Sequence, residues 1–375
     1  MKLLLDPQAY NMQRFGGITR YHTEVLVELS KMGVSIECPV LFADNLHLKE
    51  HGLFQSQWSD VMRWRWLPKF VRKKIAKKFR RKNFKRTKEA LKRQDYDVFV
   101  STYYDPYFLD YIGDKPFVLT LHDMIHDLFP QYFTRDKNTV AWKKLLLEKA
   151  TRVIAVSENS KRDALRIYPQ LDPDKFDVVY LSQSIDTVSK VHVDLPQKFI
   201  LFVGNRTIYK NFNFFIEAVA PLLKTDPDLF VVAAGGNGFE KDEADLLQKL
   251  GIAAQVIQQN FEDNELASYY GQAQCFVFPS EYEGFGIPVL EAMACGCPVV
   301  LAHHSSFPEV AGEAGVYFEL HNADDLKDKV AQLLSDPALR ADFSQKGLQR
   351  AAQFSWQKTA AGCLESYRKA LAQKA

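Results

Sequence analysis

Short apolar runs alternate with amphipathic segments along most of the chain. Most of the runs are continuously apolar, which is typical of parallel strands that helices cover on both faces. In the first half we predict strands at 2–6, 35–42, 97–101, 117–123, 152–157 and 176–181. In the second half we predict strands at 199–204, 229–236, 254–258, 275–280 and 298–302.

Helical patterns lie between these runs. We predict helices at 17–32, 139–150, 158–168, 211–224, 240–250, 263–272 and 287–295, with a helical tail from about 323. Two successive series of alternating strands and helices predict an α/β fold with two Rossmann-like, doubly wound domains. A polar stretch at 182–197 is the predicted linker. We place the domains at 1–185 and 198–352, and expect a terminal helix at 353–375 that packs back toward the first domain.

The amino-acid composition does not change this prediction of the fold class. Hydrophobic residues make up 47% of the 375 residues and charged residues 25%, as in ordinary globular proteins. The five cysteines form no CxxC pair, so we interpret them as free thiols in a reducing cytoplasm, with disulfides as the alternative. The N-terminal apolar run is too short for a signal peptide, and no run approaches the ~18 residues of a membrane span.

Charge is concentrated in one segment. Residues 63–93 hold 16 Lys or Arg and one acid, Glu89, although the formal net charge of the chain is only +2. Interleaved aromatic and aliphatic residues indicate a helix lying on anionic lipid; a nucleic-acid-binding helix and a merely solvated helix are the alternatives. The predicted membrane-surface residues are Trp64, Trp66, Arg72, Lys73, Lys74, Lys77, Lys78, Arg80, Arg81 and Lys82.

The segment "PSEYEGFGIPVLEAMACGCPVV" (279–300) places two acids beside a predicted strand end. Glu283 falls in the loop after the strand, and Glu291 about one turn into the following helix. Ligands of open α/β sheets bind at this edge, and the glycines at 284 and 286 let backbone N–H groups approach an anion. Such a site suits a sugar nucleotide. A helix-terminal glutamate and a solvated loop glutamate would explain the spacing equally well.

Cations follow another predicted strand. In "LFVGNRTIYKNFNFF" (201–215), Arg206 and Lys210 lie in the loop after Gly204 and could neutralise a diphosphate leaving group. Taken alone, such a pair is more often solvated.

Two weaker signals lie in the first half. In "MQRFGGITRYHTEV" (12–25), Gly16 and Gly17 precede a helix, as in an anion-binding loop or a flexible turn. In "VLTLHDMIHDLFP" (118–130), His122 and Asp123 follow a strand end and His126 lies one turn later. These residues have ordinary structural explanations, and the other half supplies no matching cluster for a metal.

The 279–300 segment closely resembles the E-x7-E signature of retaining GT-B glycosyltransferases of family four, the "glycosyl transferases group 1". The resemblance extends over nearly the whole chain and implies two domains facing across a cleft. It implies that Glu283 contacts the donor sugar and Glu291 the ribose, that Arg206 and Lys210 hold the pyrophosphate, and that His122 lies near the transferred sugar.

The residues implied to bind the donor or its nucleotide are Gly16, Gly17, Gly204, Arg206, Lys210, Phe261, Glu283, Gly284, Phe285, Gly286, Ile287 and Glu291. The implied catalytic residues are Glu283, His122, Arg206 and Lys210. We assign Asp123 and His126 to the acceptor side, with a structural role as the alternative, and we predict no metal ligands.

We therefore expect a retaining, metal-independent hexosyltransferase without a cofactor. The wording of "VGNRTIYKNF" and "SSFPEVAG" is similar to bacterial mannosyltransferases of O-antigen and capsule assembly, so GDP-mannose is the first expected donor. The expected acceptor is a lipid-linked glycan or oligosaccharide of cell-surface polysaccharide or lipopolysaccharide biosynthesis. The expected location is the cytoplasm, peripheral on the inner face of the membrane. A UDP-hexose-dependent enzyme, a GT-B nucleotide-sugar epimerase and a nucleic-acid-binding protein are the alternatives.

Overall fold

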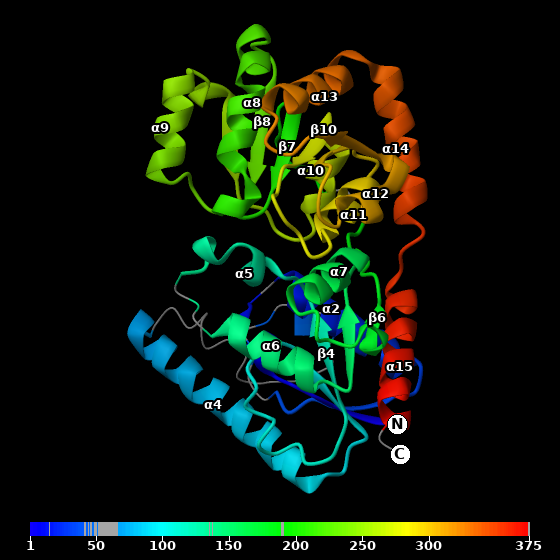
Figure 1. Ribbon diagram of the computed structural model, residues 1–375. Helices are drawn as coiled ribbons and strands as arrows, with labels where there is room; N and C mark the ends of the chain where they lie inside the picture. The colour runs from blue at the N-terminus through cyan, green and yellow to red at the C-terminus, as the bar shows by residue number, and fades with distance from the viewer. Residues whose placement is uncertain are drawn as a thin grey trace. The chain divides into compact units, whose positions relative to one another are not determined.

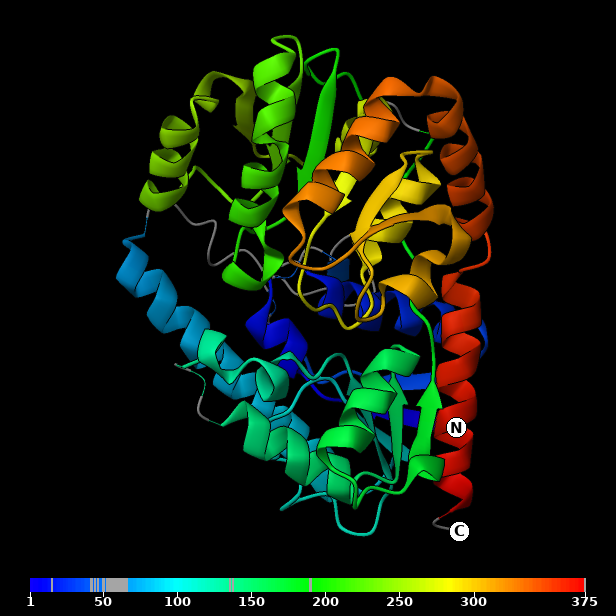
Figure 2. The same ribbon diagram turned by 45° about the horizontal axis from the view of Figure 1, so that its top comes forward.

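A computed structural model describes residues 1–14, 16–40, 43, 45, 47–48, 51, 67–134, 136, 138–188 and 191–373, and Figures 1 and 2 show it from two directions. The predicted membrane-surface residues Trp64 and Trp66 lie outside these ranges. The chain forms two compact units. Unit 1 comprises residues 1–181 and 356–375, and unit 2 comprises residues 182–355.

Unit 1 is built on a six-stranded sheet with the strand order β2-β1-β3-β4-β5-β6. All of its strand pairs are parallel. The strands are β1 (Lys2–Leu5), β2 (Ser35–Glu37), β3 (Val98–Ser101), β4 (Phe117–Leu121), β5 (Arg152–Ala155) and β6 (Phe176–Val178). The central strands β3, β4 and β5 are buried along their whole length, as continuous apolar runs require.

Helices from both ends of the chain cover this sheet (Figure 1). They are α1 (Gln8–Met12), α2 (Gly17–Lys31), α4 (Lys69–Arg93), α5 (Ile125–Leu128), α6 (Thr139–Lys149), α7 (Glu158–Ile167) and α15 (Trp356–Ala372). The terminal helix α15 packs against α2 and β5. Its Cys363 lies 3.3 Å from the Tyr21 hydroxyl of α2, and both side chains are buried.

Unit 2 is a second parallel six-stranded sheet, with the order β12-β11-β10-β7-β8-β9. Its strands are β7 (Phe199–Val203), β8 (Phe230–Ala234), β9 (Val256–Gln259), β10 (Cys275–Phe278), β11 (Val299–Ala302) and β12 (Gly315–Phe318). Its helices are α8 (Phe212–Thr225), α9 (Lys241–Leu250), α10 (Leu266–Gln272), α11 (Ile287–Ala294), α12 (Phe307–Ala311), α13 (Ala323–Ser335) and α14 (Pro337–Ala351). Strands β7 to β9 extend the sheet in one direction and β10 to β12 in the other, which is the doubly wound arrangement.

The predicted α/β fold class is confirmed, and each of the eleven predicted strands has a counterpart. β2 is shorter than predicted, and residues 41–42 of that prediction lie outside the described residues. The four-residue edge strand β12 was not predicted, because its strand character comes from pairing with β11 and not from a long apolar run. The short helices α1, α5 and α12 were missed for a similar reason, since four or five residues carry no helical periodicity.

Candidate active site

The strand order of unit 2 changes direction at β7. The chain leaves β7 for β8 on one side, whereas β10 pairs with β7 on the other side. Loops 204–211 and 279–286 therefore diverge at this topological switch point, where open α/β sheets bind ligands. Two hydrogen bonds tie the loops together: Glu281 N–H to the Tyr209 carbonyl at 2.8 Å, and Asn211 Nδ2 to the Pro279 carbonyl at 3.2 Å.

Lys210 and Glu283 meet at this switch point. The Lys210 ammonium donates to Oε1 of Glu283, and it also lies 5.0 Å from the centre of the Phe278 ring. The Lys210 side chain is 19% exposed and the Glu283 side chain is 15% exposed, so both can be reached from outside the protein. The structure thus brings together a cation and an acid that the sequence places 73 positions apart.

Serine hydroxyls hold the main chain of Glu283 in place. Ser305 Oγ accepts from the Glu283 N–H at 3.1 Å and lies 2.6 Å from the Glu283 carbonyl. Ser306 Oγ lies 3.0 Å from that carbonyl and 2.8 Å from the carbonyl of Phe285. Our sequence analysis gave these serines no role. The only local signal is a Ser-Ser pair before a proline-initiated helix.

The glycine segment after Glu283 leads directly into α11. Gly286 is the N-cap of that helix with φ of +99°, a conformation that L side chains rarely adopt, and a Cβ there would lie 3.2 Å from the Phe307 ring. Phe285 is buried, so its side chain belongs to the core. Gly284 precedes it, and Ile287 begins the helix.

Glu291 lies in α11 and is almost completely buried. The hydroxyl of Tyr270, from α10, donates to its Oε2 at 3.4 Å. Burial and the nearby Glu291 charge raise the pKa of Tyr270 well above its usual value. The prediction that Glu291 contacts a ribose stays a prediction.

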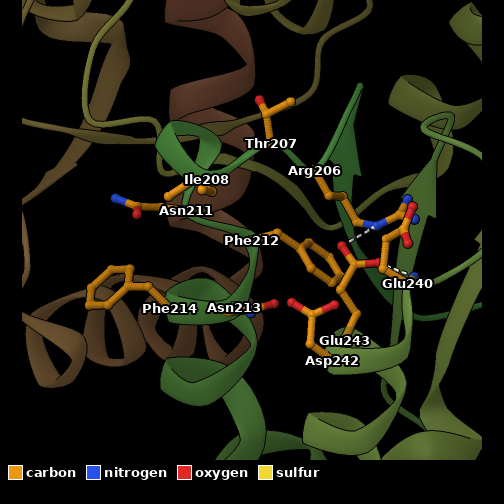
Figure 3. A pocket seen from close by; sticks show the side chains of 10 residues that line it. All are labelled: Arg206, Thr207, Ile208, Asn211, Phe212, Asn213, Phe214, Glu240, Asp242 and Glu243. Carbon is orange, nitrogen blue, oxygen red and sulfur yellow. Dashed lines mark hydrogen bonds and ion pairs between the residues drawn. The ribbon is translucent and has the colours of Figure 1, made fainter. Parts of the chain in front are cut away.

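Arg206 is engaged within unit 2 (Figure 3). Its Nε donates to Glu243 at 2.8 Å, Nη1 to the Gly235 carbonyl at 3.1 Å, and Nη2 to the carbonyls of Asn237 and Gly238 at 3.0 and 2.9 Å. The Arg206 side chain is 3% exposed, and its guanidinium carbon lies 5.5 and 4.9 Å from the ring centres of Phe212 and Phe239. Arg206 therefore joins the loop after β7 to the loop after β8.

The two loops approach closely at their glycines. Gly204 follows β7. A Cβ on Gly236 would lie 2.9 Å from the carbonyl oxygen of Gly204. Gly235 has φ of +85°, and a Cβ there would lie 3.2 Å from the ring of Phe261. Phe261, one of the residues implied to bind the donor or its nucleotide, thus packs beside these loops, and its ring centre is 5.9 Å from that of Tyr269.

The remaining predicted residues lie in unit 1. Gly16 is the N-cap of α2, and Gly17 is the first residue of that helix. The Thr19 hydroxyl donates to the Gly16 carbonyl at 3.1 Å, which stabilises the turn before the helix.

His122 and Asp123 follow β4. The backbone N–H of His122 donates to the Tyr104 hydroxyl at 3.1 Å, and burial lowers the pKa of its imidazole to about 4. Asp123 Oδ1 accepts from the Ile125 N–H at the start of α5, and its side chain is 30% exposed. The ring of His126 packs against that of Phe133 at a tilt of 32°, with ring centres 4.1 Å apart, and burial lowers the pKa of His126.

A buried lysine supports this segment. Lys143 of α6 is completely buried and donates to Asp127 at 2.7 Å and to the Asp123 carbonyl at 3.1 Å. The Tyr168 hydroxyl also donates to Asp127, at 2.6 Å. Asp127 is therefore part of a buried ion-pair network that holds the segment after β4. Lys143 was not predicted, because a lysine in an amphipathic helix normally lies in solvent.

The basic helix α4 runs along the outside of unit 1 (Figures 1 and 2). Its buried residues, Asn83, Thr87, Ala90 and Leu91, all lie in its C-terminal half. Residues 69–82 include nine Lys or Arg and no acid, and Phe70 is 72% exposed. Of the predicted surface residues here, Arg72 is half-buried and the others are exposed. Among the described helices, none has both the length and the apolar content needed to cross a bilayer.

Matches to known families cover both units. Residues 185–350 match the family "Glycosyl transferases group 1", and residues 15–182 match "Glycosyltransferase Family 4". The chain is 30% identical to the O-antigen chain mannosyltransferase B of Escherichia coli over 266 residues, which cover 67% of this chain and 70% of that protein. The chain belongs to the group 1 glycosyltransferases.

Other relatives match over smaller shares of their own length. The glycosyltransferase is 32% identical to a D-inositol 3-phosphate glycosyltransferase of Frankia alni over 59% of this chain and 60% of that protein. It is 28% identical to the serotype-specific mannosyltransferase WbdA of Escherichia coli over 68% of this chain, but this match spans only 33% of WbdA.

Solved structures identify the fold as GT-B. Sucrose-phosphate synthase from Thermosynechococcus elongatus matches the glycosyltransferase with a TM-score of 0.73 at 20% identity, over 99% of both chains. WaaG, a glycosyltransferase involved in lipopolysaccharide biosynthesis, matches with a TM-score of 0.68 at 16% identity, over 97% of this chain and 99% of that one. At these identities the likeness concerns the fold alone.

Proposed function

We propose that unit 2 binds a nucleotide diphosphate hexose at its switch point, and that the enzyme transfers the hexose with retention to a glycan acceptor. The pairing of Lys210 with Glu283 carries this proposal. A carboxylate accepts hydrogen bonds from sugar hydroxyls, whereas an ammonium binds phosphate oxygens as a point charge. A bound diphosphate would replace Glu283 as the partner of the Lys210 ammonium. Glu283 could then accept hydrogen bonds from the sugar.

The leaving group determines the rest of the mechanism. Charge develops on the departing diphosphate, and in this proposal Lys210 and the amides at the start of α11 stabilise it. We assign this role to Lys210 in preference to Arg206, because four N–H groups of Arg206 already donate within unit 2. Since a fixed cation and helix amides can serve this purpose, the proposed reaction needs no metal ion. Retention is inferred from the resemblance of 279–300 to the E-x7-E signature.

GDP-mannose is the proposed donor. The support for this donor is that two of the relatives, mannosyltransferase B and WbdA, are named as mannosyltransferases. The proposed acceptor is a lipid-linked glycan of cell-surface polysaccharide assembly, reached from the cytoplasmic face of the membrane. A UDP-hexose is the alternative donor.

Calorimetric titration with GDP-mannose and UDP-hexoses, followed by transfer assays, tests this proposal. We expect binding of GDP-mannose, transfer that EDTA leaves unchanged, and an α-linked product by NMR. Lys210→Met should weaken nucleotide diphosphate binding about 10- to 100-fold, because a charge-assisted contact is lost. Lys198→Met, which removes an ion pair with Asp226 instead, is the matched control. Equal affinity in Lys210→Met, or donor turnover without an acceptor, as an epimerase would show, contradicts the proposal.

We also propose that α4 binds an anionic membrane surface. Because its apolar positions Val71, Ile75 and Phe79 are half-buried, attraction between its bases and lipid headgroups should dominate binding. Each base near an anionic surface contributes about 1 kcal/mol. Replacing Lys73, Lys77 and Arg80 by glutamine should therefore weaken binding to phosphatidylglycerol vesicles about 100-fold, as measured by co-sedimentation at low salt.

The control for this experiment uses three exposed lysines of unit 2, namely Lys224, Lys241 and Lys249. Their replacement by glutamine should leave vesicle binding within about twofold of the unmodified protein. Undiminished sedimentation of the α4 variant, or salt-dependent binding to duplex DNA without vesicle binding, would contradict the membrane role.

A further inference from the structure

The loop after β11 contains a residue with an unfavourable backbone conformation. Ser305 has φ of +58°, in the left-handed region that residues with a side chain rarely adopt. It follows a tight turn in which the backbone N–H of His304 donates to the Ala302 carbonyl at 2.7 Å. A glycine would take this conformation without strain, so the shape of the loop does not by itself require a serine. Strain of this kind gathers where a residue has a further role.

The next residue, Ser306, does not make the contact expected of its position. It is the N-cap of α12, and an N-cap serine usually accepts a hydrogen bond from the first turn of its helix. The Ser306 side chain makes no such bond. Ser306 is completely buried, and its hydroxyl lies instead 3.0 Å from the Glu283 carbonyl and 2.8 Å from the Phe285 carbonyl. Two neighbouring serines therefore depart from local preference, and both contact the loop after β10.

The hydroxyl of Ser305 restrains both sides of a single residue. It accepts from the Glu283 N–H at 3.1 Å and donates to the Glu283 carbonyl at 2.6 Å. Because these two groups flank the Cα of Glu283, the bonds restrain its backbone dihedral angles and hence the direction in which its side chain points. Residues 279–286 form no helix or strand. Their conformation therefore depends on contacts of this kind and not on a regular hydrogen-bond ladder.

This restraint matters most once the donor is bound. Before binding, the Lys210 ammonium contacts the Glu283 carboxylate. In the proposed function the diphosphate replaces Glu283 as the partner of Lys210, so this contact is lost when the carboxylate has to hold the sugar. The bonds from Ser305 persist through that exchange, because they involve the main chain of Glu283 and not its side chain.

We propose that Ser305 is a positioning residue, which holds the backbone of Glu283 so that the carboxylate stays directed at the sugar after Lys210 has bound the diphosphate. The inference rests on the proposed function, since it takes Glu283 as the group that binds the sugar. Ser305 acts through Glu283 and not on the substrate.

Ser305→Gly tests this inference, because glycine removes the hydroxyl and adopts the left-handed conformation without strain. We expect kcat for hexose transfer to fall about 10- to 100-fold, the range for a reacting group misplaced by about 1 Å. The KM for the donor should stay within about twofold, because Lys210 still binds the diphosphate. The matched control is His321→Gly, which relieves another positive φ, of +67°, in an exposed loop after β12 and should leave kcat unchanged.

A double-mutant cycle with Glu283→Ala separates positioning from an independent effect. Once the carboxylate is gone, adding Ser305→Gly should lower kcat by less than about threefold, because the group that Ser305 positions is already missing. The same loss of kcat in both backgrounds would overturn the inference. A Ser305→Gly enzyme with raised KM and unchanged kcat, or with the kinetics of the unmodified enzyme, would overturn it as well.

Failure of the proposed function would be seen separately. If the unmodified enzyme transfers no hexose, amide hydrogen exchange of the full chain decides the inference instead. The Glu283 amide should exchange about tenfold faster in Ser305→Gly than in the unmodified protein and in His321→Gly, since its acceptor is lost. Equal exchange in all three proteins refutes the anchoring of Glu283 by Ser305.

Discussion

Glutamine in place of Glu283 is expected to lower the rate of hexose transfer by about 100- to 1000-fold, the range for losing one preorganised polar contact to a transition state. The substitution removes the negative charge that Lys210 contacts, and an amide is a weaker acceptor for sugar hydroxyls than a carboxylate. The fold of unit 2 should persist, because Ser305 and Ser306 bond to the main chain of residues 283 and 285 and not to the side chain.

The matched control for this prediction is Asp226→Asn. Asp226 also pairs with a lysine, Lys198, at 2.6 Å. Lys198 precedes β7, so this pair lies at the opposite edge of the sheet from the switch point. Single-turnover kinetics should show an unchanged rate in the control. A rate for Glu283→Gln within a few-fold of the unmodified enzyme would remove Glu283 from the mechanism.

Replacing Arg206 by methionine is expected to lower the free energy of unfolding by about 3–5 kcal/mol, as is usual when one partner of a buried ion pair is removed. Glu243, whose side chain is 6% exposed, would lose its charged partner. The carbonyls of Gly235, Asn237 and Gly238 would each lose a donor. Urea unfolding of the ligand-free protein measures this loss.

Two further variants separate this structural role from diphosphate binding. Replacing both Arg206 and Glu243 by methionine removes both charges of this buried ion pair, and should recover most of the stability. Lys198→Met, which breaks a half-exposed pair, should cost less than about 1 kcal/mol. If Arg206→Met unfolds like the unmodified protein but binds nucleotide diphosphate weakly, the original prediction of a phosphate ligand is correct.

Much of the candidate site in unit 2 could be predicted from local sequence. Apolar runs mark β7 and β10, and the glycines and proline after Glu283 mark a loop that enters a helix. Since parallel strands all end at the same edge of a sheet, Lys210 and Glu283 could be expected at one edge. Their direct contact could not be predicted, because it requires β10 to pair with β7 although two strands intervene in the sequence.

Partners of buried polar side chains were the least predictable feature. Arg206 and Lys210 stand four positions apart in one loop and carry the same charge, yet Arg206 is engaged by Glu243 and only Lys210 contacts Glu283. Lys143 looks like any surface lysine in an amphipathic helix, yet it is completely buried against Asp127. In each case the deciding partner comes from another element.

The sequence by itself determined the fold class and the edge of each sheet at which chemistry-bearing residues gather. Hydrophobic periodicity and turn residues act over a few neighbours, so one chain segment is enough to read them. Only the tertiary structure decided which charges pair and which serines hold Glu283. Those contacts join residues that lie from 16 to 73 positions apart, and packing of whole elements, not local preference, brings them together.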